Sequence, residues 1–274
     1  MRPVEISVIL AVFNEEKYLP LCLSSLAQQR GVNYEVVVVD DGSYTKIFNF
    51  QFSIFKSKKF RFFRIKHGGT ARARNFGAKR AQGKILVFID GDMKFASDFL
   101  VKLTEPIREG KSKGTFSTEE YVANWENVWA RCWNWENGLP DKRRIDQHRV
   151  DMVKDFRAIL KSEFERIGGF ADIGYTDTWT LAEKLGYYPT AVREADYWHY
   201  NPDNLNEVFR QAVWIGGRKR RFGWLGKLGA LVRATLPVSL MVGVFKSLTH
   251  QELRFIWFKL IYDLGIFVGV VGSL

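Results

Sequence analysis

The sequence predicts an α/β fold in which helices flank a mixed, mainly parallel sheet. Two continuous β-branched runs, ISVILAVF and EVVVVD, are typical of strands buried on both faces of a parallel sheet. Polar turns follow both runs, and helical patterns separate the apolar segments along the first 200 residues. Alternating buried strands and helices place a ligand site beyond the carboxyl ends of the strands.

The elements can be assigned in order. After the first strand, Asn14 offers an N-cap to a helix whose first turn is acidic. The second strand ends in two aspartates, and the aromatic and cationic segment FKSKKFRFFRIK, between residues 47 and 66, is expected to contain a third strand. ARARNFGAKRAQG then predicts a helix stopped by Gly83, and KILVFIDGDM a fourth strand ending in acids.

Composition narrows the class of protein. With 274 residues the chain can bury a large core without disulfides, and Cys22 and Cys132 lack metal or redox spacing, which indicates free thiols in a reducing compartment. No signal peptide is expected before Glu5. Lysine and arginine number 41 against 30 acids, a net charge of +11, so anionic partners are favoured: nucleic acid, an acidic membrane or a phosphorylated substrate.

The composition changes after the basic cluster RKRR at residues 218–221. Two apolar stretches follow, at residues 224–245 and 255–274, and each has roughly the length that spans a bilayer as a helix. The chain is therefore expected to divide into a catalytic domain, residues 1–221, and a C-terminal membrane-associated segment of two helices, residues 222–274. That segment either spans the bilayer as a short hairpin or lies in its interface, and two core helices of a soluble protein are the alternative.

Acidic side chains follow two of the predicted strands. Asp40 and Asp41 close one strand, and Asp90 and Asp92 close another, with Gly91 between them. Residues two apart in an extended strand share a face, and the glycine lets the backbone turn, so both carboxylates of the second pair can point into one cleft. Paired carboxylates suit Mg²⁺ or Mn²⁺ held partly by a substrate diphosphate; a solvated acidic turn is the alternative.

The ordered set ISVILAVFNEEKYL, VVVVDDGS, GGTARARNFGAKRAQGKILVFIDGDM, IGGFAD and a later histidine resembles the family 2 glycosyltransferases of GT-A fold. The resemblance covers residues 4–218. No Walker A loop and no GxGxxG follow the first strand, which disfavours an NTPase or a dehydrogenase. The resemblance implies an inverting transferase that uses a nucleotide-sugar donor and a divalent metal.

The resemblance also implies roles for particular residues. Asp90, Asp92 and His199 would hold Mn²⁺ or Mg²⁺. Asp40 would be structural, and the choice between Arg72 and Arg74 as the nucleotide contact is open. The residues implied to contact the nucleotide sugar are Ala11, Phe13, Glu15, Asp41, Arg72, Arg74, Asp90, Asp92 and Arg218.

Asp177 is the candidate general base. An inverting transfer needs a group that takes the acceptor hydroxyl proton as the oxygen attacks the anomeric carbon. The resemblance places that acid after the GGF stretch, where IGGFADIGYTDTW keeps Asp177 and has Thr176 in place of a second acid. The alternative role for Asp177 is to cap the helix that follows it.

The acceptor and its location are predicted less directly. Trp125, Trp129 and Trp133 share a helix face, which indicates core packing or a platform for sugar or lipid. Because the C-terminal segment is apolar, we expect the acceptor to be a hydroxyl of a lipid-linked sugar or glycolipid. We expect the protein to lie at the cell membrane, with the catalytic domain facing the cytoplasm. The same helices are a candidate homodimer interface. The alternative enzyme is a polyprenyl-phosphate sugar synthase. There are two non-enzymatic alternatives: a sugar-nucleotide scaffold, and a basic nucleic-acid-binding protein, for which the sequence contains no motif.

Overall fold

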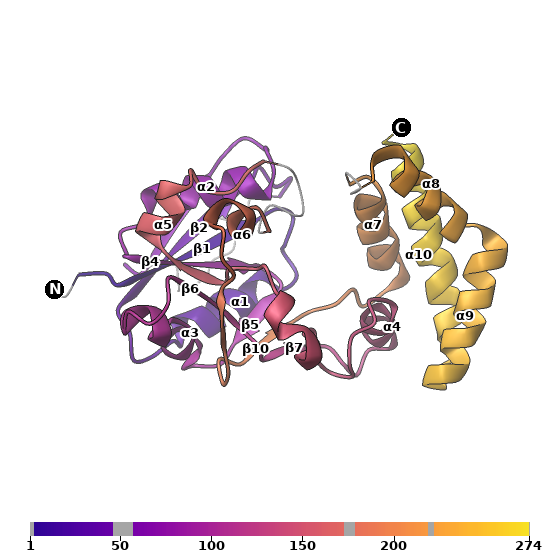
Figure 1. The fold of residues 1–274 in the computed structure, drawn as a ribbon, viewed down its shortest axis with the longest axis horizontal. Helices are drawn as coiled ribbons and strands as arrows, with labels where there is room; N and C mark the ends of the chain where they lie inside the picture. The colour runs from indigo at the N-terminus through magenta and orange to yellow at the C-terminus, as the bar shows by residue number, and fades with distance from the viewer. Residues whose placement is uncertain (1–2, 46–56, 173–178, 219–221, 274) are drawn as a thin grey trace. The chain divides into compact units, whose positions relative to one another are not determined.

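The computed structural model describes residues 3–45, 57–172, 179–218 and 222–273 (Figure 1). The chain forms two compact units. The first comprises Met1–Ala123 and Ile145–His199, and the second comprises Asn124–Arg144 and Tyr200–Leu274. Each unit therefore contains two separate stretches of chain, and each is described by itself below.

A seven-stranded sheet in the order β3-β2-β1-β4-β8-β6-β9 is the centre of the described part of the first unit. β1, β2, β3 and β4 run parallel to one another, β6 and β9 are parallel to each other, and β8 is antiparallel to both β4 and β6. The predicted mainly parallel sheet is therefore confirmed, together with the expected third strand. The strands span Ile6–Val12 (β1), Tyr34–Asp40 (β2), Phe60–Arg64 (β3), Ile85–Asp90 (β4), Gly114–Ser117 (β6), Ala158–Leu160 (β8) and Thr190–Val192 (β9).

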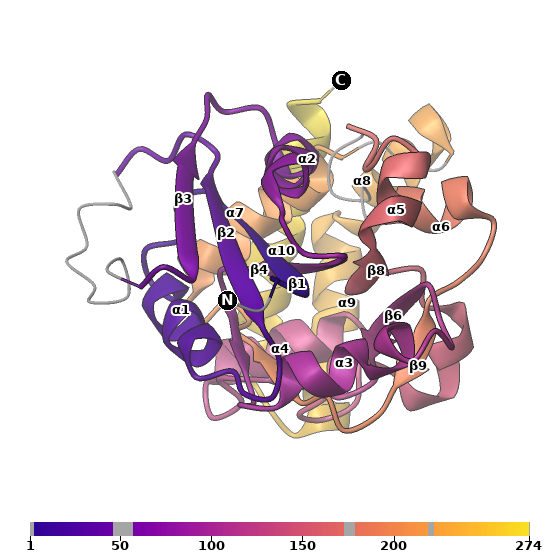
Figure 2. The same ribbon diagram turned by 90° about the vertical axis from the view of Figure 1, so that its left-hand side faces the viewer.

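Helices cover both faces of this sheet (Figure 2). Successive side chains of a strand point to opposite faces, so Val8 and Leu10 of β1 pack in a core with one group of helices while Ile9 packs with another. This is why the first strand is almost entirely apolar, without alternation; its one polar residue, Ser7, donates to Glu35 at 2.7 Å. The first face carries α1 (Leu19–Ala27) and α3 (Phe99–Arg108), and the second carries α2 (Thr70–Arg80), α5 (Lys161–Arg166) and α6 (Trp179–Leu185).

A small second sheet lies beside the end of β4. It has the order β5-β10-β7, with β10 antiparallel to β5 and parallel to β7. The strands are β5 (Met93–Phe95), β7 (Glu120–Val122) and β10 (Tyr197–His199), and a 3-10 helix, η3, covers Gln147–Met152. This sheet joins three stretches that are far apart in the sequence.

The second unit is helical. It contains α4 (Val128–Glu136), α7 (Leu205–Gly216), α8 (Gly223–Arg233), α9 (Leu236–His250) and α10 (Arg254–Val271), and α10 contacts the other four. Trp133 and Trp135 of α4 are buried with Phe255 and Phe258 of α10. The tryptophan-rich segment was expected either to pack in a core or to form a platform for sugar or lipid, and these two rings pack in a core.

The expectation of two C-terminal helices was wrong in detail, because the first apolar stretch forms α8 and α9 separately. Pro237 lies in the first turn of α9, where proline is tolerated at a helix start but not inside a continuous helix. Within the described residues, no single helix passes a length and hydropathy test for a membrane span, but α8 and α9 pass it as a pair bent by 66°. The functional division at residue 221 remains a prediction.

Candidate active site

The acidic strand ends meet at one edge of the sheet, as the sequence indicated. β1 is hydrogen-bonded to both β2 and β4, and its register pairs Val12 with Asp40 and Ala11 with Asp90. Gly91 follows directly, and a Cβ atom on it would lie 2.7 Å from Cγ of Glu15. This glycine is therefore required by close approach, because any side chain would displace Glu15 from the turn.

Asp41 organises the loop that precedes α2. Its buried carboxylate accepts hydrogen bonds from the backbone N–H groups of Gly68 at 3.0 Å and Gly69 at 2.8 Å, and Nδ1 of His67 lies 2.9 Å from it. The His67 ring stacks on Phe13, with 4.2 Å between ring centroids. His67, which we did not predict as a site residue, thus links the two predicted base-binding residues Phe13 and Asp41.

Asp40 is held differently. Its Oδ1 accepts from the backbone N–H of Ser43 at 2.9 Å, and Arg64 Nη1 lies 3.5 Å from Oδ2. The side chain is fully buried beneath the turn. These contacts match the structural role expected of it.

Two buried arginines surround Asp90. Nη2 of Arg74 lies 2.6 Å from its Oδ1, and Nη1 of Arg157 lies 3.8 Å from its Oδ2. Burial opposes ionisation of this carboxyl, but the two guanidinium groups outweigh burial and lower its pKa. Arg74 is thus committed to Asp90, whereas Arg72 is exposed at the start of α2. Of the two, Arg72 is the arginine whose side chain is accessible to a nucleotide.

Arg157 connects Asp90 to the small sheet. Its Nη2 donates to Asp155 at 3.2 Å and to the Tyr197 hydroxyl at 3.4 Å, and its Nη1 donates to the carbonyl oxygen of Phe88 at 3.3 Å. The predicted site did not include Arg157, because nothing in the local sequence marks it. Its role arises from the antiparallel pairing of β8 with β4.

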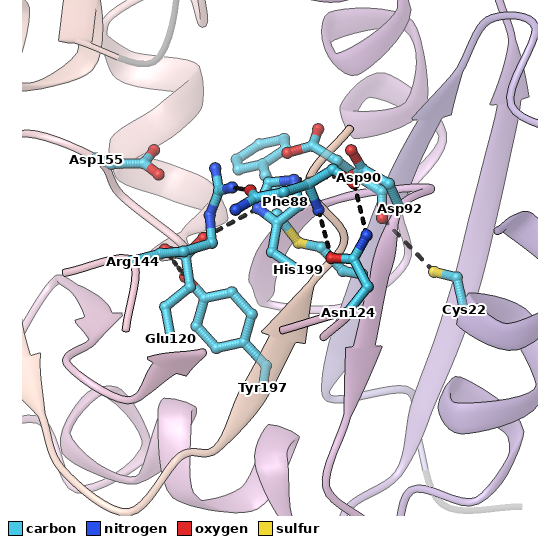
Figure 3. Close-up of polar contacts among 12 residues, drawn as sticks. Cys22, Phe88, Asp90, Asp92, Glu120, Asn124, Arg144, Asp155, Tyr197 and His199 are labelled. Carbon is cyan, nitrogen blue, oxygen red and sulfur yellow. Dashed lines mark hydrogen bonds and ion pairs between the residues drawn. The ribbon is translucent and has the colours of Figure 1, made fainter. Parts of the chain in front are cut away.

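His199 lies between two carboxylates (Figure 3). Its Nδ1 is 2.9 Å from Oε1 of Glu120, and its Nε2 is 3.1 Å from Oδ1 of Asp92. Oε2 of Glu120 accepts from the Tyr197 hydroxyl at 2.7 Å, and burial raises the pKa of Tyr197 well above its usual range, so the tyrosine remains a donor. We assign the Nδ1–H tautomer to a neutral His199, since Glu120 is an acceptor.

This tautomer leaves a lone pair on Nε2 of His199 directed at an acceptor. Oδ1 of Asp92 is buried and makes no hydrogen bond within the described part of the chain. Two electron-pair donors 3.1 Å apart match the spacing of neighbouring ligands on an octahedral cation, which is about 3 Å for metal–ligand distances of about 2.1 Å. The residues therefore fit a divalent metal, with Glu120 orienting the histidine.

The predicted ligand set is only partly assembled. Among the described residues, no group of three or more histidine, cysteine or acidic side chains is arranged to hold a metal ion. Asp92 and His199 come together, but the carboxylate of Asp90 is directed to Arg74 and Arg157. Asp177 lies outside the described residues. Arg218 belongs to the second unit, where its guanidinium lies 3.8 Å from the centre of the Trp214 ring.

Comparison with known proteins identifies the family. The family model for glycosyl transferase family 2 matches residues 7–168, which is more than half of the chain. The chain belongs to glycosyl transferase family 2. The match runs from β1 to α5 and includes Asp41, Asp92, Glu120 and Arg157.

Curated relatives of this family 2 glycosyltransferase align with about a third of its length. An uncharacterized glycosyltransferase of Rickettsia felis is 35% identical over 98 residues, which cover 36% of this chain and 16% of that protein. One from Haemophilus influenzae is 38% identical over 99 residues, covering 35% of this chain and 40% of the relative. These alignments therefore span less than half of either relative.

Two solved structures share the GT-A fold of this glycosyltransferase at low sequence identity. TarS 1-349 from S. aureus in complex with UDP-GlcNAc has a TM-score of 0.60 at 16% identity, covering 96% of this chain and 90% of that one. The mannosyltransferase PcManGT from Pyrobaculum calidifontis, in complex with GDP-Man and Mn²⁺, has a TM-score of 0.60 at 17% identity, covering 99% and 88%. The predicted fold class is confirmed.

Proposed function

We propose that this family 2 enzyme is a metal-dependent inverting hexosyltransferase. It moves a hexose from a UDP- or GDP-sugar to a hydroxyl of a lipid-linked acceptor or glycolipid at the cell membrane, with its catalytic unit in the cytoplasm. The observation that carries the proposal is the facing pair of Asp92 Oδ1 and His199 Nε2 at the sheet edge. UDP-GlcNAc in one structural neighbour, and GDP-Man with Mn²⁺ in another, support both donor classes.

The donor's nucleoside would lie against Phe13, whose ring is 38% exposed and is backed by His67. Asp41 fixes the Gly68–Gly69 turn through two backbone N–H groups and so sets the shape of this wall. Arg72 supplies an exposed cation at the start of α2, where a helix N-terminus also favours negative charge. Together these groups favour a nucleoside diphosphate.

Asp92 and His199 would hold the divalent cation, and Glu120 keeps the histidine in the ligating tautomer. When bound, the cation neutralises the charge that develops on the leaving nucleoside diphosphate, the chemistry that a metal site of this kind supplies. Arg74 and Arg157 act on the protein itself, because they hold Asp90 ionised and in place beside the site. Asp177 remains the proposed base that accepts the acceptor proton.

The donor proposal is tested by thermal unfolding with a panel of UDP- and GDP-sugars, each with Mn²⁺ or Mg²⁺. A ligand at about 100 times its Kd stabilises the folded state by about 2.7 kcal/mol, so the matching donor should raise Tm only when the metal is present. Asp92→Asn should abolish the metal-dependent shift, and the exposed Asp151→Asn is the matched control. Stabilisation by no nucleotide sugar would contradict the proposal.

The acceptor proposal is tested by Asp177→Asn. A hydroxyl acceptor needs a base, whereas a phosphate acceptor is already an anion. If the acceptor is a hydroxyl, the variant should bind donor normally while transfer falls by roughly 10²-fold or more. Unchanged transfer to a polyprenyl phosphate would favour the alternative, a polyprenyl-phosphate sugar synthase.

A further inference from the structure

Helix α9 has its polar and apolar sides reversed relative to an ordinary surface helix. The side that faces the protein consists of the small residues Ser239, Gly243 and Ser247, spaced four apart, and all three are buried. The opposite side is exposed and almost entirely apolar. Its large exposed residues are Leu236, Leu240, Met241, Val244, Phe245 and Leu248.

This reversal is typical of helices that contact lipid. Small residues let helices pack closely, and large apolar side chains face the surrounding hydrocarbon. Helix α8 and the residue before it continue the exposed apolar surface through Phe222, Trp224, Leu225, Leu228 and Val232. We name these residues, together with the exposed face of α9, the apolar surface. An apolar surface that extends over two helices marks an interaction site.

The charged residues of the segment that carries the apolar surface are all positive. Residues 222–251 contain Lys227, Arg233 and Lys246 and no aspartate or glutamate, and RKRR precedes them. Lys246 is turned inward to Glu136 at 3.0 Å, whereas Arg233 is exposed. A surface that is apolar and cationic, with no acid, is complementary to a membrane that contains anionic lipid.

The α7 side of the helical unit is more polar than the α9 side. Helix α10 contacts α9 through Lys259 and Asp263 and contacts α7 through Gly265 and Gly269, so it lies between them (Figure 1). Three of the four exposed residues of α7 are polar. They are Asn206, Arg210 and Gln211, and the fourth is Trp214. The side chains exposed on α9 therefore suit lipid hydrocarbon, and those exposed on α7 suit water.

The geometry also excludes a straight span by α8 and α9. At 1.5 Å per residue, α9 is about 22 Å long and α8 about 16 Å, and each is shorter than the hydrocarbon core of about 30 Å. The two helices are bent by 66° from each other. A spanning arrangement would also carry α10 and the polar α7 into the bilayer with them.

We infer that α8 and α9 lie in the plane of the membrane and insert the apolar surface into one leaflet that contains anionic lipid. This inference rests on the membrane part of the proposed function and not on the transfer reaction. It replaces two open alternatives, a spanning hairpin or interfacial helices, with one arrangement. It also assigns the contact to the outer faces of α8 and α9, whereas α10 packs between α9 and α7 and exposes Trp257 and Leu264 elsewhere on its surface.

Flotation of the full chain with vesicles tests the inference. The chain should float with vesicles of phosphatidylcholine plus phosphatidylglycerol and less with phosphatidylcholine alone. Met241→Glu with Phe245→Glu should reduce partitioning about tenfold or more, because two charges would enter the leaflet. The matched control is Met152→Glu with Tyr188→Glu, two exposed apolar residues of the first unit. Unaltered flotation of the Met241 and Phe245 variant would overturn the inference.

Two further readouts keep the outcomes separate. Donor hydrolysis without vesicles should be equal in both double variants, so a failed transfer reaction is not confused with failed membrane binding. With protein added outside sealed vesicles, a membrane-impermeant maleimide should label Asn206→Cys and Gln251→Cys alike, because Gln251 is exposed and continues the line of small residues on α9 rather than the apolar surface. Labelling of Gln251→Cys only after detergent would indicate a span and would overturn the inference. A vesicle-independent dimer abolished by Phe245→Glu would assign the apolar surface to a second copy and would also overturn it.

Discussion

The two units expose different kinds of side chain. In the first unit the partly exposed side chains of Asp92 and His199 meet near the end of β4. In the second unit Lys259 and Asp263 are buried between helices, whereas α9 exposes Met241 and Phe245. The difference follows from what each surface faces: water and substrate in one case, lipid, as we propose, in the other.

The comparison also separates functional from structural charge clusters. In the second unit Lys259 lies 2.7 Å from Glu136 and 2.9 Å from Asp263, and Ser239 donates to Asp263 at 2.6 Å. These buried groups bind one another. In the first unit Oδ1 of Asp92 lies 3.1 Å from Nε2 of His199 and makes no hydrogen bond within the described residues. An incompletely satisfied cluster indicates a ligand site, and a satisfied one indicates packing.

The largest effect is expected from breaking the cluster in the second unit. Lys259→Met should lower the free energy of unfolding by about 3–5 kcal/mol, because Glu136 and Asp263 lose their shared buried cation. Urea denaturation followed by circular dichroism measures it. Lys111→Met, which removes an exposed lysine paired with Glu109, is the control and should change stability little. Equal losses of unfolding free energy for the two substitutions would show that the buried cluster around Lys259 does not stabilise the second unit.

Glu120→Gln should weaken metal binding with little loss of stability. The carboxylate accepts from both His199 and Tyr197, whereas an amide has only one acceptor oxygen, so the tautomer of His199 is no longer enforced. Changes of this kind typically reduce metal affinity about 10- to 100-fold. Calorimetric titration of Mn²⁺ with bound nucleotide, with Glu109→Gln as the control, measures the change. An unaltered affinity would mean that Glu120 does not orient the histidine.

Two serines of α9 form a matched pair. Ser239→Ala removes the donor to Asp263 and should cost about 1–3 kcal/mol. Ser247 is also buried, but its hydroxyl has no hydrogen-bond partner within the described residues, so Ser247→Ala should be neutral or stabilising. Thermal unfolding of the two variants distinguishes them. A larger decrease in Tm for Ser247→Ala than for Ser239→Ala would contradict the stabilising role of the hydrogen bond from Ser239 to Asp263.

The smallest effect concerns an acid on the surface of the first unit. Hydrogen bonds from Arg166, Lys113 and Tyr187 outweigh partial burial and lower the pKa of Glu163 from 4.5 to about 2. A lowered pKa stabilises the fold above the unfolded-state pKa, and this contribution is lost as the pH falls through the folded-state pKa. The small Tm difference between wild type and Glu163→Gln should therefore shrink between pH 4.5 and about 2. A Tm difference that grew as the pH fell would contradict the lowered pKa of Glu163.

Much of the first unit could be predicted from local sequence. The buried strands are mostly apolar because helices cover both faces of the sheet, and parallel strands bring their carboxyl ends to one edge. Asp41, Asp90 and Asp92 could therefore be placed together. The role of Arg157 could not, because the arginine reaches Asp90 only through the pairing of β8 with β4.

The sequence by itself determined the α/β class, the acidic strand ends and the apolar, cationic character of the C-terminal segment, because these depend on residue type and short-range spacing. Tertiary structure decided which arginine binds Asp90, which carboxylates flank His199 and which side of α9 is exposed. Each of these depends on contacts between stretches far apart in the chain. Hydropathy shows that a helix is apolar, but only packing shows that its small residues face the protein and its large ones face outward.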